Sequence, residues 1–184
     1  MSLTLVRHTR PDVPAGLCYG RLDVALLDTF ADEAAAVLRM LPEVRRVAAS
    51  PLRRCRELAQ HIAASRSLPL HVDQRLIEMD FGAWEGRLWS QLPAPELQAW
   101  ANDFMHARPH GGESVAMLQR RVEDAIAHWT AYREPIALVT HAGVIKAAAS
   151  AGGSQARDFA VSVDFGGIMG LAQSRPRPTK ETQA

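Results

Sequence analysis

The sequence has few cysteines, almost no excess of charge and no long hydrophobic run. Cys18 and Cys55 are its two cysteines in 184 residues, too few for a disulfide framework and not spaced as zinc ligands are. We therefore expect reduced, partly buried thiols in a cytoplasmic protein. The formal net charge of +1 gives no support for a nucleic acid or an anionic membrane as a partner.

Signals for export or membrane insertion are missing as well. The most apolar stretch, residues 135–153, contains His141 and Lys146, and no stretch supplies the ~18 apolar residues that a spanning helix needs. No basic segment precedes a long apolar stretch at the amino terminus, so we expect no secretory signal. The 47% of hydrophobic and 22% of charged residues are ordinary for a globular protein.

What the sequence does contain is an alternation of strands and helices. Apolar strands are expected at residues 3–6, 44–49, 68–72, 135–140 and 166–172. The run 135–140 is nearly continuous in apolar residues, as in the centre of a sheet that is covered on both faces. This alternation predicts an α/β layered domain with a mainly parallel sheet over residues 1–173, followed by a disordered tail at 174–184.

Helices are expected between these strands. One follows Asp28 as its N-cap and ends at Pro42, and another has Ser50 as its N-cap and Pro51 in its first turn. Helical spacing of apolar residues also predicts a long helix over 115–129 and a shorter one from about residue 142. Pro93 and Pro95 interrupt the remaining helical stretch, so two short pieces are expected within 89–105.

Polar residues stand where three of these strands end. These residues are Arg7 with His8, Ser50, and His141. The carboxyl ends of parallel strands share one edge of a sheet, where ligands bind. Arg53 and Arg54 lie in the first turn of the helix after Ser50, and helix starts favour anions. Arginine suits phosphate oxygens and a neutral imidazole can attack phosphorus, so this edge predicts a phosphoryl site.

Transfer of a phosphoryl group also needs a proton for the leaving alcohol. Glu78 is a candidate acid, because its apolar neighbours Leu76, Ile77 and Met79 favour a carboxyl group that holds a proton. Asp80 and Glu85 lie close by in the sequence. Spacing alone does not choose among these three carboxylates.

With these motifs the chain resembles the histidine phosphatase superfamily of phosphoglycerate-mutase-like enzymes. The matching blocks are Leu-Val-Arg-His-Thr at 5–9, Ser-Pro-Leu-Arg-Arg at 50–54, Leu-Ile-Glu at 76–78 with Phe-Gly-Ala-Trp-Glu-Gly at 81–86, Gly-Gly-Glu-Ser at 111–114, and Val-Thr-His-Ala-Gly at 139–143. The resemblance implies a three-layer α/β/α sandwich with a small helical insertion at about 87–112.

The resemblance also implies a role for each motif residue. His8 is then the nucleophile that forms a phosphohistidine, and Glu78, rather than Asp80 or Glu85, is the acid and base. The phosphate ligands are then Arg7, His141 and Arg54, the last in preference to Arg53. No metal or other cofactor is implied. The other histidines, His61, His71, His106, His110 and His128, are expected at the surface, with His110 the one that borders the pocket.

A finer resemblance lies in the first loop. Thr9 stands where most of the superfamily has glycine, and residues 16–26 are similar to the α-ribazole 5′-phosphate phosphatases of cobalamin biosynthesis. Thr9, Tyr19 and Arg21 are therefore expected to contact a small phosphomonoester substrate. The alternatives are a sugar-phosphate phosphatase, a phosphoglycerate mutase, a protein phosphohistidine phosphatase and a non-catalytic phosphate-binding module. A homodimer through the Trp-containing insertion is a further possibility that the sequence leaves open.

Overall fold

The computed structural model describes residues 2–171 and has a five-stranded sheet at its centre. The strand order is β3-β2-β4-β1-β5. The strands are β1 (Leu3–Arg7), β2 (Arg46–Ala49), β3 (Leu70–Val72), β4 (Ile136–Thr140) and β5 (Ile168–Leu171). β5 runs antiparallel to β1, and every other neighbouring pair is parallel. The predicted mainly parallel sheet is confirmed, with the apolar strand β4 in the middle.

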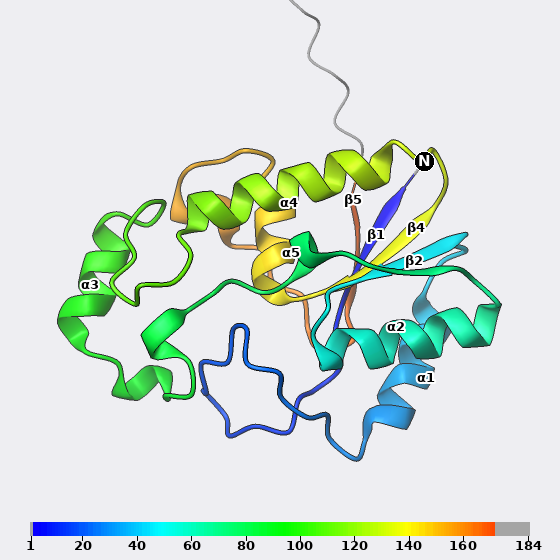
Figure 1. The fold of residues 1–184 in the computed structure, drawn as a ribbon, viewed down its shortest axis with the longest axis horizontal. Coiled ribbons are helices and arrows are strands. Elements are labelled where there is room, and N and C mark those ends of the chain that lie inside the picture. Colours follow the sequence, from blue (N-terminus) through cyan, green and yellow to red (C-terminus); the bar gives the residue numbers. More distant parts are fainter. Residues whose placement is uncertain (1, 172–184) are drawn as a thin grey trace, which may run out of the picture.

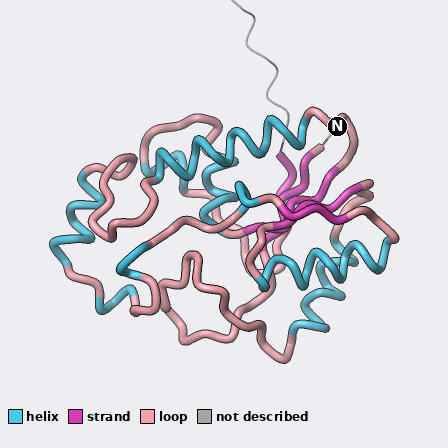
Figure 2. The backbone as a smooth tube through the Cα atoms, in the orientation of Figure 1, coloured by secondary structure: helices cyan, strands magenta, loops and turns pink. Residues whose placement is uncertain are grey.

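Helices cover both faces of this sheet (Figure 1). The α-helices are α1 (Phe30–Met40), α2 (Arg53–Arg66), α3 (Ala94–Asn102), α4 (Val115–Thr130) and α5 (Ala142–Ala149). Short 3-10 turns are η1 (Gln74–Leu76), η2 (Gly82–Trp84), η3 (Trp89–Gln91) and η4 (Ala156–Phe159). α1 and α2 lie on one side of the strands, and α4 and α5 on the other (Figures 1 and 2). The fold is therefore the expected three-layer α/β/α sandwich.

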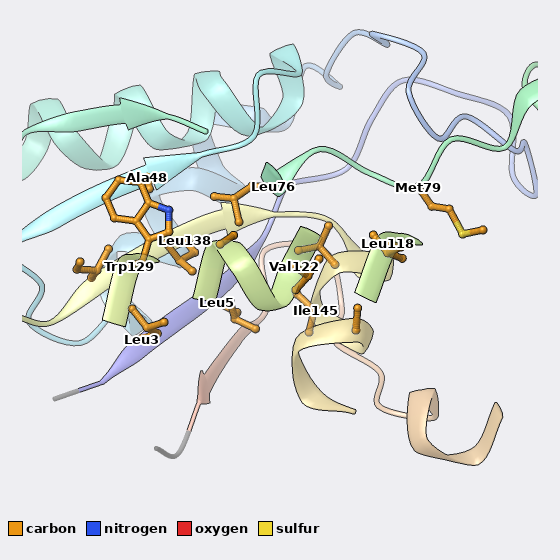
Figure 3. Close-up of a cluster of buried hydrophobic side chains, with 14 of the residues drawn as sticks. Leu3, Leu5, Ala48, Leu76, Met79, Leu118, Val122, Trp129, Leu138 and Ile145 are labelled. Atoms are coloured by element: carbon orange, nitrogen blue, oxygen red, sulfur yellow. The ribbon is translucent and has the colours of Figure 1, made fainter. Parts of the chain in front are cut away.

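Strand β4 shows how the sequence produces the two covered faces. All five of its residues are buried, and successive side chains point to opposite sides of the sheet. Ile136 and Leu138 join the cluster formed with α4 and α5, where Trp129 and Val122 also pack (Figure 3). Val139 belongs to the cluster formed with α1 and α2. Because both faces of β4 are covered, every residue of the strand is buried, and the strand reads as a continuous apolar run in the sequence.

The helical insertion extends away from the sheet. The two short pieces predicted within 89–105 are η3 and α3, and Pro93 separates them as the N-cap of α3. In Figure 1, α3 lies at the far left, at a distance from all five strands. An element in this position can shape a cavity at the strand ends without taking part in the sheet.

Two expectations concern the ends of elements. Helix α1 begins at Phe30 with Thr29 as its N-cap, one residue beyond the predicted Asp28. The last strand ends at Leu171, while Ala172 and the predicted tail 174–184 lie outside the described residues. Within residues 2–171, no helix combines the length and the apolar character that crossing a bilayer requires.

Candidate active site

Neighbouring strands bring the predicted histidines together at their carboxyl ends. The His8 backbone N–H donates to the Thr140 carbonyl at 3.0 Å, and the Ser50 backbone N–H donates to the Val139 carbonyl at 3.0 Å. These bonds extend the parallel ladder one residue beyond β1 and β2. The rings of His8 and His141 consequently lie 5.2 Å apart, measured between centroids.

The ring of His8 is buried and held by its own backbone. Nδ1 lies 2.7 Å from the carbonyl oxygen of Thr9, which can only accept, so Nδ1 carries the proton. The lone pair is thereby left on Nε2. Burial, and next the positive charge of Arg54, lower the pKa of His8 from 6.5 to about 3. The ring is therefore uncharged near pH 7. It lines a cavity at the strand ends.

Two arginines lie beside this imidazole without a counter-ion. Arg54 is fully buried, and its guanidinium donates to the carbonyls of Leu22 at 2.7 Å and Gly20 at 2.6 Å. Arg7 donates to the Val163 carbonyl at 2.8 Å. Among residues 2–171, neither arginine forms an ion pair, and the buried Nε atom of each lacks a hydrogen-bond partner. Partly or fully buried cations that lack a carboxylate partner favour an anion beside them.

Glu78 also lines the cavity, and two backbone N–H groups fix its carboxylate. One carboxylate oxygen accepts from Met79 at 2.9 Å, and the other accepts from Gly143 at 3.1 Å, in the first turn of α5. A Cβ atom at Gly143 would collide with the Glu78 carboxylate. Glycine at 143 therefore lets the helix start approach the carboxylate. Asp80 and Glu85 do not line the cavity, so geometry now separates the three candidates.

His141 is completely buried, and its Nε2 lies 2.7 Å from the Ser50 hydroxyl. The Cys55 sulfur lies 3.4 Å from the same nitrogen and 3.4 Å from the Thr140 carbonyl. Burial, and next the charge of Arg54, lower the pKa of His141 well below 6.5. The expectation that Ser50 caps a helix is wrong, because α2 begins at Arg53 with Leu52 as its N-cap. Ser50 instead orients the second histidine.

Of the three residues predicted to contact the substrate, only Tyr19 lines the cavity. Tyr19 lines the cavity, its ring lies 5.1 Å from the Arg54 guanidinium carbon, and burial raises the pKa of its hydroxyl. Thr9, Arg54 and His141 are fully buried, and none of the three is among the residues that line the cavity. Arg21 is not on the cavity either, because its guanidinium forms ion pairs with Asp80 at 3.5 Å and Glu113 at 3.7 Å.

His110 is a correction to the expected surface histidines. Its side chain is 2% exposed, and its ring lies 4.7 Å from that of Trp84. Nδ1 accepts from the Gly112 backbone N–H at 3.0 Å. The burial follows from the glycine-containing turn that precedes α4, which folds back onto the segment around Phe81. His71, His106 and His128 are exposed and His61 is half-buried.

The cavity has a volume of about 490 Å³ and is lined by both polar and aromatic side chains. The polar residues include Arg7, His8, Tyr19 and Glu78. The aromatic side chains contact one another in sequence and form an aromatic wall: Phe81, Trp89, Trp100, Phe104 and Phe159. Sequence reasoning missed this wall and missed Lys146, which also lines the cavity. The available signal for Lys146 was its position one helical turn after Ala142.

The described part of the chain offers no cluster of metal ligands. Among residues 2–171, no three His, Cys, Asp or Glu side chains gather where they could share a metal ion. The acidic side chain of the cavity, Glu78, is already bonded to two backbone N–H groups. Chemistry without a metal stays a prediction from the sequence, with its test given below.

Comparison with known proteins agrees with this geometry. The model of the histidine phosphatase superfamily (branch 1) matches residues 3–166. An adenosylcobalamin/alpha-ribazole phosphatase of Salmonella typhimurium is 33% identical over 153 residues, covering 79% of this chain and 76% of the relative. A glucosyl-3-phosphoglycerate phosphatase of Mycobacterium tuberculosis is 30% identical over 166 residues, covering 81% and 74%.

Solved structures give the same answer. The alpha-ribazole phosphatase of Shigella flexneri superimposes with a TM-score of 0.82 at 30% identity, covering 95% of this chain and 92% of that one. The sequence match spans most of the chain, and each of these relatives is named as a phosphatase. The protein is therefore a phosphatase, and it belongs to the histidine phosphatase superfamily.

Proposed function

We propose that this phosphatase hydrolyses a small phosphomonoester through a phosphohistidine on His8, with Glu78 as acid and base and without a metal. The observation that carries the proposal is the buried neutral His8 beside Arg7 and Arg54, two cations that lack a counter-ion among residues 2–171. A phosphoryl group in the cavity supplies the missing negative charge. Glu78 lines the same cavity.

In the first step, the Nε2 lone pair of His8 attacks phosphorus as the ester P–O bond breaks. Glu78 gives its proton to the departing alcohol oxygen and becomes a carboxylate. Arg7, Arg54 and His141 hold the phosphoryl oxygens, on which the charge of the transition state is spread. The bond from Nδ1 to the Thr9 carbonyl keeps the ring oriented during the attack.

In the second step, water replaces the alcohol. The Glu78 carboxylate takes a proton from water as its oxygen bonds to phosphorus and the N–P bond breaks. Inorganic phosphate leaves, and His8 regains its lone pair on Nε2. The cycle closes without net transfer of protons to the enzyme, because Glu78 ends as it began.

For the alcohol, we propose α-ribazole 5′-phosphate as the substrate in a cytoplasmic setting. Tyr19 and the aromatic wall suit an alcohol with a flat ring, and two of the relatives above are named as alpha-ribazole phosphatases. Both cysteines are free and buried, which suits a reducing compartment. We assign a substrate contact to Tyr19, which lines the cavity, and none to Thr9 and Arg21, which do not line it.

A phosphorylated sugar acid is the second candidate. Lys146 lines the cavity, and no carboxylate among the described residues forms an ion pair with it. An ammonium group in this place suits a substrate with a carboxylate on its alcohol. The similarity to a glucosyl-3-phosphoglycerate phosphatase points in the same direction.

Turnover of p-nitrophenyl phosphate tests the chemistry. We expect activity to persist in a chelator and to disappear in His8→Ala, while His128→Ala, a change at an exposed position, retains it. Loss of activity in the chelator would contradict the proposal.

For the substrate, kcat/KM is compared for α-ribazole 5′-phosphate, 3-phosphoglycerate, sugar phosphates and a phosphohistidine peptide. The proposal requires α-ribazole 5′-phosphate to lead by at least about tenfold, or ~1.4 kcal/mol.

A further inference from the structure

The main chain that carries Glu78 is irregular, and a side chain from α4 holds it in place. No helix or strand includes residues 77–81. Arg121, on α4, donates from Nη1 to the carbonyls of Arg75 and Ile77, both at 2.7 Å. Its Nη2 donates to the carbonyl of Glu78 itself at 3.1 Å. One guanidinium therefore fixes the backbone on which the acid stands.

The guanidinium of Arg121 has no donor left for another partner. Its remaining N–H groups bind the carboxylate of Glu113, from Nε at 2.7 Å and from Nη2 at 2.8 Å. A guanidinium has five N–H donors, and the two bonds to Glu113 together with the three to carbonyls use all five. Neither Arg121 nor Glu113 is among the residues that line the cavity. Arg121 therefore acts on the loop and not on a bound molecule.

The Gly-Gly-Glu-Ser motif at 111–114 places Glu113 against the same loop. The Glu113 backbone N–H donates to the Asp80 carbonyl at 2.8 Å. A Cβ atom at Gly112 would collide with that carbonyl oxygen, so glycine is what allows the turn to approach the loop. The motif thus holds the chain just after Glu78, while Arg121 holds the chain at Glu78 and before it.

We propose that Arg121, oriented by Glu113, is a positioning residue for the catalytic acid. The two side chains fix the backbone at residues 75–78, so that the Glu78 carboxylate reaches the oxygen of the leaving alcohol. Displacing a catalytic group by 1 Å can cost about 10²-fold in rate. This inference rests on the proposed function, which makes Glu78 the acid, and it gives the Gly-Gly-Glu-Ser motif a part in the same reaction.

A displaced acid has a signature that a general loss of structure lacks. Phenolate is strongly basic and needs a proton as it leaves, whereas 2,4-dinitrophenolate leaves without one. For both esters, kcat/KM reports the steps up to formation of the phosphoenzyme. Misplacing Glu78 should therefore slow phenyl phosphate selectively. Damage to the fold or to the phosphate ligands should slow both esters by the same factor.

The experiment compares these two esters in Arg121→Lys. Lysine keeps the positive charge beside Glu113 but has three donors in place of five, so at least two bonds are lost. We expect kcat/KM for phenyl phosphate to fall by about 10²-fold, with 2,4-dinitrophenyl phosphate and inhibition by inorganic phosphate changed by less than about threefold. Arg120→Lys, the same change at the exposed neighbouring position, is the matched control and should leave both esters unaffected.

Glu113→Gln is the second variant, in case Arg121→Lys does not fold. Its amide offers Arg121 one acceptor in place of two, so we expect the same selective loss on phenyl phosphate, at about tenfold. Glu78→Gln is the reference for complete loss of the acid. It should slow phenyl phosphate far more than 2,4-dinitrophenyl phosphate.

The reference variant also separates the two ways in which the inference can fail. If Glu78→Gln is selective but the folded Arg121 and Glu113 variants slow both esters equally, or slow neither, the positioning role is wrong and the proposed function stands. If Glu78→Gln itself slows both esters equally, Glu78 is not the acid, and the inference fails together with the proposed function.

Discussion

His8 has a neutral ring because its surroundings oppose a second proton. Burial is the largest cause, the charge of Arg54 is the next, and together they lower its pKa to about 3. The hydrogen bond to the Thr9 carbonyl acts in the opposite direction and does not outweigh them. A histidine of this kind needs no base to remove a proton before it attacks phosphorus.

This neutrality is directly measurable. We expect the ring resonances of His8 to keep their chemical shifts between about pH 5 and about pH 8, because its pKa of about 3 lies below that window. Histidine NMR spectra of the selectively labelled protein test this, with free histidine in the same tube as the pH reference. A midpoint for His8 within the window would contradict the account of the nucleophile.

Ser50 is the other residue whose role is testable by itself. Ser50→Ala removes the partner at 2.7 Å from Nε2 of His141 and leaves that nitrogen buried. We expect inhibition by inorganic phosphate to weaken by about tenfold, since a lost partner costs ~1–3 kcal/mol. Cys55→Ala removes only a weak donor at 3.4 Å from the same nitrogen, so its effect should be smaller. An unchanged inhibition constant in Ser50→Ala would show that Ser50 does not orient His141.

At the scale of elements, the site depends on how closely α5 approaches the loop that carries Glu78. Gly143→Ala places a methyl group against the Glu78 carboxylate and breaks the bond from the Gly143 N–H. We expect kcat to fall by about 10²-fold or more, because acid–base catalysis contributes about 10²–10⁴-fold. Gly170→Ala is the control, since a Cβ there meets no atom within 4 Å. Equal activity of both variants would contradict the assignment of Glu78.

The start of α4 gives a prediction for stability. Ser114 is its N-cap, and its hydroxyl accepts from the Met117 N–H at 3.2 Å. Ser114→Ala should lower the free energy of unfolding by ~1 kcal/mol. Ser114→Asp keeps an acceptor at the cap and should lower it less. Urea unfolding of the three proteins measures the difference, and a loss in Ser114→Ala close to zero would mean that the cap bond does not contribute.

Element types were predictable from the sequence, but the exact partners at their ends were not. The apolar run at 135–140 predicted a central strand, and the spacing of apolar residues predicted α4, because both signals come from burial. Ser50-Pro51 has the local pattern of a helix start, yet Ser50 continues the ladder beside Val139 and bonds to His141. The Ser50 hydroxyl could cap a helix or bond to His141, and contacts between distant parts of the chain decided between the two.

At the scale of the whole molecule, buried neutral histidines make the fold sensitive to acid. His8 titrates at 6.5 when unfolded and at about 3 when folded, so the unfolded chain binds more protons between these values. Its contribution is complete above about pH 6.5 and is lost as the pH falls toward about 3. We expect His8→Gln to show a weaker loss of unfolding free energy over this range than the wild type. His106→Gln, at an exposed position, is the control, and parallel curves for His8→Gln and the wild type would contradict the buried neutral state.

The assembly of the site was predictable in part. Strand ends in a parallel sheet share an edge, so the convergence of Arg7, His8 and His141 followed from the pattern of elements. The aromatic wall was not predictable, since it requires knowing how the insertion folds over the cavity. Arg21 shows the same limit: it belongs to the matching loop, but its ion pairs with Asp80 and Glu113 direct it elsewhere.

A phosphohistidine on His8 can be trapped and located. With p-nitrophenyl phosphate, Glu78→Gln should still release the weakly basic leaving group but should activate water poorly, giving a burst of about one product per site. Quenching in alkali preserves phosphohistidine, and peptide mass spectrometry locates it. We expect one phosphoryl group on His8 and none on His141. A phosphoryl group on another residue, or turnover without any phosphoenzyme, would contradict it.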